Sequence, residues 1–190
     1  MVSIKIYLVS LVLGVMTYAD PGCVEVSPAS NYVNALYVGR WYEIGRIQTP
    51  GGASYQENCW CDTTDFTTEF LTVGDGEVTY SCRQDGPDGA LQSATADLLY
   101  EGEPGHFKQQ FRFPFAPKLD YSIIFIDEDT AMEYDCHTDL QGDTDYCVHF
   151  MSRFPSIEEN KLLELIEYAE GLGLNNQNVN YTATEHVGCW

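Results

Sequence analysis

The sequence has little positive charge. Only 9 of its 190 residues are Lys or Arg, against 29 Asp or Glu, so the formal net charge is −20. A surface of this sign repels nucleic-acid phosphates and anionic lipid headgroups. We therefore expect no nucleic-acid partner and no membrane insertion, and we interpret the acidity as a source of solubility.

Long apolar runs are absent beyond the N-terminus. Residues 1–19 contain Lys5, an apolar run from Ile6 to Met16 and a small-residue ending at Ala19. The run is too short to span a bilayer, and no stop-transfer charges follow it. We expect residues 1–19 to be a cleaved secretory signal and residues 20–190 to form one secreted, extracellular domain of 171 residues (190 minus 19).

The sequence also lacks the spacing of metal ligands. Its histidines are scattered along the chain: His106, His137, His149 and His186. The segment Cys59-Trp60-Cys61 lacks the two-residue spacer of zinc and redox motifs. Asp and Glu are so abundant that no pair stands out as an acid and a base. We predict no metal site, no required cofactor and no catalytic residue.

Cysteine is present in an odd number. All seven cysteines lie beyond Ala19: Cys23, Cys59, Cys61, Cys82, Cys136, Cys147 and Cys189. Disulfides persist in the oxidising compartment to which a secretory signal leads. At least one thiol stays free or forms an intermolecular bond, which leaves a homo- or hetero-oligomer open. The sequence alone does not assign the pairing.

Short strand-like runs separated by turn residues fill the middle of the chain. After a first strand near Gly39, the expected strands are 59–71, 77–83, 92–100, 106–113, 119–127, 131–137 and 145–154. The turns between them are rich in Gly, Pro and Asp. Eight regularly spaced strands predict an all-β protein, either an antiparallel sandwich or an up-and-down barrel.

Alternation within the strands predicts an apolar interior. Phe107, Phe111 and Phe113 share one face of their strand, and polar residues occupy the other. Small residues such as Ala94 and Ala96 beside aromatic rings suit a ligand cavity, although the same mixture also fills a tapering solid core. We favour the cavity. Its predicted wall consists of Tyr80, Tyr100, Phe107, Phe111, Phe113, Tyr121, Ile123 and Phe125.

After the last strand the pattern changes to that of a helix. Ser156 and Glu159 have the spacing of a capping box, and an apolar stripe follows before Gly171. The stripe consists of Leu162, Leu163, Leu165, Ile166 and Ala169. We predict one amphipathic helix packed outside the barrel and a short edge strand within 180–184. Asn180-Tyr181-Thr182 is a glycosylation sequon, so Asn180 is a predicted glycosylation site.

The opening Gly39-Arg40-Trp41-Tyr42 carries a family resemblance. Together with eight strands, the pair Ser152-Arg153 and a following helix, it resembles the lipocalins. Within them, it is most similar to the branch of apolipoprotein D, insect bilin-binding proteins and crustacyanins. The resemblance implies an eight-stranded antiparallel up-and-down β-barrel, the lipocalin calyx, with one C-terminal helix outside. It also implies that Trp41, which follows Gly39 closely, plugs the closed end and that Arg153 stacks on it.

The resemblance also implies a disulfide pattern. In that branch the pairing corresponds to Cys23–Cys136 and Cys59–Cys189. The remaining cysteines, Cys61, Cys82 and Cys147, have no counterpart, and two of them are free to form a third bridge.

The resemblance implies a secreted carrier of one small hydrophobic ligand, such as a bilin, carotenoid, retinoid, sterol or fatty acid. The alternative is a lipocalin-fold enzyme acting on a lipid or a carotenoid. A thiol enzyme of this kind requires an inward-facing Cys. Alternation from an outward-facing Cys59 places Cys61 outward as well. We therefore favour the carrier, with no catalytic residue.

Overall fold

A computed structural model describes residues 22–189; the predicted signal, residues 1–19, lies outside them. Nine strands and two α-helices occur in the described part. Their order is α1 (Asn34–Tyr37), β1 (Gly39–Gln48), the 3-10 helix η1 (Ser54–Gln56), β2 (Cys59–Thr67), β3 (Gly76–Gln84), β4 (Leu91–Tyr100), β5 (His106–Phe111), β6 (Lys118–Ile126), β7 (Thr130–Thr138), β8 (Thr144–Ser152), α2 (Glu159–Gly171) and β9 (Thr182–Ala183). No helix within residues 22–189 has the length and apolarity needed to cross a bilayer.

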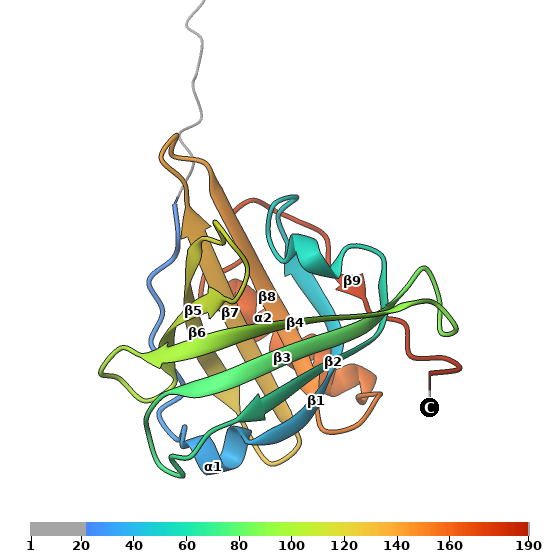
Figure 1. Cartoon of the computed structure of the whole chain (residues 1–190), viewed down its shortest axis with the longest axis horizontal. Coiled ribbons are helices and arrows are strands. Elements are labelled where there is room, and N and C mark those ends of the chain that lie inside the picture. Colours follow the sequence, from blue (N-terminus) through green and yellow to red (C-terminus); the bar gives the residue numbers. More distant parts are fainter. Residues whose placement is uncertain (1–21, 190) are drawn as a thin grey trace, which may run out of the picture.

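Strands β1 to β8 close into one antiparallel barrel (Figure 1). Each strand pairs with its neighbour in sequence, and β1 completes the ring by pairing with both β8 and β2. The short strand β9 adds to β1, with Gly45 opposite Ala183. The predicted barrel and the predicted edge strand are therefore confirmed. Closure leaves none of the eight strands with a free edge.

The helix α2 packs on the outside of the barrel (Figure 1). Its Leu165 and Ala169 are buried against outward-facing side chains of β6, β7 and β8, among them Ile124, Met132 and Phe150. The predicted capping box was wrong, because the helix begins at Glu159 with Glu158 at the N-cap and no side-chain cap. Leu163, placed in the apolar stripe, is 51% exposed.

Helix α1 and the start of β1 seal one end of the barrel (Figure 1). The Trp41 ring is fully buried, stacks on Tyr37 at 5.6 Å, and donates its Nε1–H to the Tyr37 carbonyl at 2.8 Å. The Arg153 guanidinium lies 3.6 Å from the Trp41 ring centroid and donates to the carbonyls of Leu36, Val38 and Arg40. This cation–π contact ties β8 to β1 at the closed end, as the resemblance implies.

Gly39 precedes this plug in a conformation that favours glycine. Its φ is +98°, and a Cβ added there would lie 3.5 Å from Nη1 of Arg153. Because a side chain would be strained at this φ, the glycine lets the chain turn from α1 into β1 directly beneath the arginine.

Three disulfides join the described cysteines: Cys23–Cys136, Cys59–Cys82 and Cys61–Cys189. The first agrees with the resemblance, whereas the expected Cys59–Cys189 bond was wrong. The reason is a bulge in β2, where the register shifts between Trp60 and Thr63 and Cys61 has a φ of +59°. The bulge breaks the alternation on which the expectation depended, so Cys61 contacts the C-terminal tail while Cys59 pairs with β3. Cys147 is a buried free thiol.

Candidate functional site

The closed half of the barrel is a packed apolar core. Six residues of the predicted ligand wall belong to the apolar cluster that contains Trp41, and four of them lie in this half: Tyr100, Phe107, Tyr121 and Ile123. All but Tyr100 are fully buried. Their rings and methyl groups fill the space beside Trp41 with one another, so this half is the solid core that the sequence left as the alternative.

Two other predicted wall residues, Tyr80 and Phe111, lie nearer the open end. There they contact Tyr55, which η1 inserts into the mouth. The Tyr55 ring centroid is 5.3 Å from that of Tyr80 and 4.8 Å from that of Phe111. Phe113 follows the end of β5, is 50% exposed, and contacts Phe111 at 5.4 Å.

The eighth predicted wall residue, Phe125, faces out of the barrel, so this expectation was wrong. Its ring packs against Tyr168 of α2 at 6.0 Å, and the Lys161 ammonium lies 4.8 Å from its centroid. The cause is a bulge in β6, where the register shifts between Ile123 and Phe125. The extra residue reverses the alternation, so Ile123 points inward and Phe125 does not.

Two cavities flank Tyr55 at the open end. One has a volume of about 210 Å³ and is lined by Tyr55, Gln56, Asp62, Tyr80, Ser81, Cys82, Gln92, Ser93 and Ala94. The other has a volume of about 110 Å³ and is lined by Gly51, Gly52, Ala53, Tyr55, Phe111, Phe113, Pro117, Leu119, Asp135, His137 and Asp145. Tyr55 belongs to both linings, so it forms the partition between them.

The middle layer of the interior is charged, and the expectation of an apolar interior was wrong there. Six ionisable side chains are buried in it: Glu43, Arg46, Asp62, Glu133, Asp135 and His149. None is more than 7% exposed. Ionised groups in such surroundings require partners, so the charge state of each side chain depends on its contacts within the layer.

Glu43 is the centre of this layer. Its carboxylate contacts the Arg46 guanidinium, and its Oε2 lies 2.6 Å from Nδ1 of His149. The other ring nitrogen of His149, Nε2, lies 2.9 Å from Oδ2 of Asp135. Gln56 and Thr184 also donate to Glu43, at 3.1 and 2.9 Å. Both cations of the layer therefore contact the same carboxylate.

These contacts fix the charges of Glu43 and His149. Burial disfavours an ionised Glu43, but Arg46 and His149 outweigh it and hold the pKa of Glu43 well below its usual range. Burial by itself would lower the pKa of His149. The hydrogen bonds of His149 to Asp135, Cys147 and Glu43 reverse that effect and raise the pKa of His149 well above its usual range. The pair is thus a carboxylate and an imidazolium.

Two carboxyl groups of the layer are less well paired. Burial and the charge of Glu43 raise the pKa of Asp62 well above its usual range, and Arg46 at 3.8 Å only partly offsets them. Burial likewise raises the pKa of Glu133, whose carboxylate accepts from the Tyr37 hydroxyl. Asp62 Oδ1 and Glu133 Oε2 have no hydrogen-bond partner within residues 22–189. The layer therefore has acceptors in excess of donors.

Cys147 is an inward-facing thiol of the kind that a thiol enzyme requires. Its sulfur lies 3.7 Å from Nδ1 of His149. Burial raises the pKa of Cys147 to about 12, although His149 lowers it. The sulfur is therefore protonated at neutral pH. Because the thiolate is the nucleophilic form of cysteine, Cys147 is held in its unreactive form.

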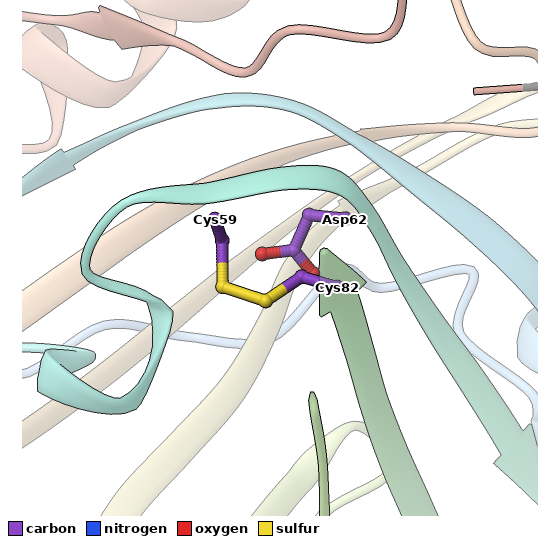
Figure 2. A group of neighbouring side chains, drawn as sticks. All are labelled: Cys59, Asp62 and Cys82. Carbon is purple, nitrogen blue, oxygen red and sulfur yellow. A yellow bond between two sulfur atoms is a disulfide. The ribbon is translucent and has the colours of Figure 1, made fainter. Parts of the chain in front are cut away.

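A disulfide lies beside Asp62 at the edge of the larger cavity (Figure 2). Cys59, Asp62 and Cys82 are the one group of potential ligands within residues 22–189 that is close enough to hold a metal ion. The two sulfur atoms are bonded to each other in Cys59–Cys82, so they are not thiolate ligands. The Asp62 carboxylate alone remains, and it faces the cavity.

The sequence analysis missed the polar interior, although one of its residues could have been found. Gln109 is fully buried, and its place between Phe107 and Phe111 on the inward face of their strand indicates a polar group inside the barrel. Glu133 and Asp135 alternate with apolar residues of β7 that face α2. A strand covered on both sides does not show which of its faces points into the barrel, so these two carboxylates gave no signal.

Comparison with known proteins places this barrel in a family. The family model described as a lipocalin-like domain matches residues 35–184, which extend from α1 through the barrel to the strand after α2. The chain belongs to the lipocalin family. Members of this family bind small hydrophobic ligands.

Three relatives of this lipocalin illustrate the range of the similarity. A putative lipocalin, R877, of Acanthamoeba polyphaga mimivirus is 28% identical over 148 residues, which are 74% of this chain and 79% of that protein. Apolipoprotein D of Mus musculus is 24% identical over 171 residues, covering 88% and 84% of the two chains. The structure of insecticyanin from the tobacco hornworm Manduca sexta matches with a TM-score of 0.63 at 14% identity, covering 88% and 87%. The last match supports the fold alone.

Proposed function

We propose that this lipocalin is a secreted carrier that binds one small, largely apolar molecule at the open end of its calyx. The observation that carries the proposal is the pair of cavities on either side of Tyr55. Aromatic walls with a few buried polar groups are typical of small-molecule sites. The family supports the same class of function, and the three disulfides fit an extracellular protein.

The size of the cavities limits the ligand. Volumes of about 210 and 110 Å³ fit a molecule of one or two rings better than an extended carotenoid. A larger ligand requires η1 to move, because Tyr55 separates the two cavities. Displacement of Tyr55 would join them into one site with Tyr80 and Phe111 in its wall. We propose no catalytic residue.

Isothermal titration calorimetry with retinol, biliverdin and palmitate tests this proposal on the wild type and two Phe→Ala variants. Phe111→Ala enlarges the cavity wall and should change the affinity of a bound ligand about 10-fold with a modest loss of stability. Phe107→Ala is the matched control on the same strand. It hollows the closed-end core and should cost about 3–5 kcal/mol of stability. Equal effects of both variants on affinity and stability would contradict a site at the open end.

A further inference from the structure

The larger cavity beneath Tyr55 has an unusual composition for the site of an apolar molecule. The rings of Tyr55 and Tyr80 line it, together with the methyl group of Ala94. Asp62 and Gln56, which are at most 1% exposed, line it as well. An acid and an amide thus meet two aromatic rings in one cavity of about 210 Å³.

These two polar side chains present acceptor atoms that lack donors. Asp62 Oδ2 accepts from Gln56 Nε2 at 2.9 Å, whereas Asp62 Oδ1 and Gln56 Oε1 have no hydrogen-bond partner in the described chain. A buried acceptor that has lost water without gaining a donor is costly, and most buried polar atoms in proteins are paired. A ligand that brings N–H groups to this point would satisfy both oxygens.

The charge of the interior favours a cation over an uncharged donor. The buried layer holds four carboxyl groups, Glu43, Asp62, Glu133 and Asp135, but two cationic side chains. Arg46, the cation nearest to Asp62, is engaged by Glu43 and by the Gln56 carbonyl, to which it donates at 2.8 Å. A positive charge placed at Asp62 would stabilise its ionised form, which burial and Glu43 disfavour, while an anionic ligand would disfavour that form further.

We propose that the cavity binds a small aromatic amine. Its protonated nitrogen donates to Asp62 and Gln56, and its ring packs against Tyr55 and Tyr80, whose faces also attract a cation. The volume suits one ring system with a short chain, since a cavity of about 150 Å³ holds a benzene molecule. This inference names the ligand class of the site proposed above and rests on that proposed function.

Tryptamine and its alcohol analogue tryptophol test the charge requirement. The two molecules share the indole ring and differ at the end of the side chain. The primary amine is protonated at pH 7, as a Lys side chain with a pKa of ~10.4 is. Isothermal titration calorimetry at pH 7 should show tryptamine binding about 10- to 100-fold more tightly than tryptophol, since a hydrogen bond to a buried charge is at stake.

Asp62→Asn assigns this preference to one carboxyl group. The variant keeps the shape of the side chain, and we expect it to bind both molecules with about equal affinity. Asp65→Asn is the matched control, because Asp65 lies three residues along the same strand and forms an exposed ion pair with Arg40 at 2.8 Å. This control should retain the preference. A thermal melt of each variant verifies that it is folded.

The outcomes separate this inference from the carrier function. Equal binding of tryptamine and tryptophol by the wild type, or an unchanged preference in Asp62→Asn, would overturn the amine site. Should retinol still bind in that case, the carrier would stand without it. Failure of retinol, biliverdin, palmitate and both indoles to bind would overturn the carrier as well. The comparison within the wild type decides the question even if Asp62→Asn does not fold.

Discussion

Two isosteric substitutions in the buried charged layer should have very different effects on stability. Glu43→Gln and Asp62→Asn each remove one fully buried carboxyl group from the same interior. Glu43 contacts both Arg46 and His149, whereas the nearest cation to Asp62 lies 3.8 Å away. A model that counts only burial predicts similar effects for the two substitutions. A model that counts pairing predicts different ones.

The magnitude follows from the partners. Glu43→Gln leaves His149 with Asp135 alone and leaves Arg46 with Asp62, which is 3.8 Å away. Removal of one partner from a buried ion pair costs about 3–5 kcal/mol. For a domain of this length the melting temperature should fall by about 6–20 °C, at about 2–4 °C per kcal/mol. Asp62→Asn removes a carboxyl that burial disfavours, so the change should be within about 1 kcal/mol or stabilising.

Urea unfolding at pH 8, followed by near-UV circular dichroism, measures the free energy of unfolding of the wild type and of both variants with the disulfides intact. At this pH the cost of an ionised Asp62 is largest, because the folded protein raises the pKa of that group. A larger loss of stability in Asp62→Asn than in Glu43→Gln would refute the assignment of Glu43 as the partner of both cations.

Two further predictions concern the plug and the pH dependence. Arg153→Ala removes the contact with Trp41 and should lower stability by about 1–3 kcal/mol. Retinol affinity should be unchanged, since the plug lies at the closed end. Denaturant unfolding measures the stability and calorimetry measures the affinity; a loss of affinity without a loss of stability would place Arg153 in the binding site. Stability should fall as the pH rises from 5 to 9, because Asp62, Glu133 and His149 all have raised pKa values in the folded protein. Such groups hold more protons when folded, so the carboxyl contributions are lost above their unfolded pKa values near ~4 and that of His149 above ~6.5. The stabilising effect of ionised Glu43 has the opposite sign and is lost only as the pH falls through its depressed pKa. Thermal melts between pH 5 and 9 test the trend, and a steady rise in stability would contradict it.

The barrel could be predicted from the sequence because its signals are local. Alternation placed Phe107 and Phe111 inward, and turn residues separated the eight strands. Trp41 and Arg153 were found through the resemblance, since the sequence of one strand does not show what stacks on its tryptophan. The structure adds the contact between Arg153 and Trp41, which joins the end of the last barrel strand, β8, to the first, β1.

The parts that could not be predicted depend on bulges and on two-sided burial. A bulge of one residue turned Phe125 toward α2, and another gave Cys59 and Cys61 different partners from those expected. Such register shifts leave no trace in a pattern of period two. The position of Tyr55 in the mouth was equally hidden, because η1 lies in a loop whose path depends on tertiary contacts.

Crystallography of a complex tests the central claim, that the open end of the calyx binds one small molecule, most directly. The ligand to use is retinol or tryptamine, whichever binds more tightly in calorimetry. We predict one molecule in contact with Tyr55 and Tyr80, with the Trp41 plug unchanged. A ligand bound only to the outer surface, with Tyr55 still packed on Tyr80 and Phe111, would contradict it.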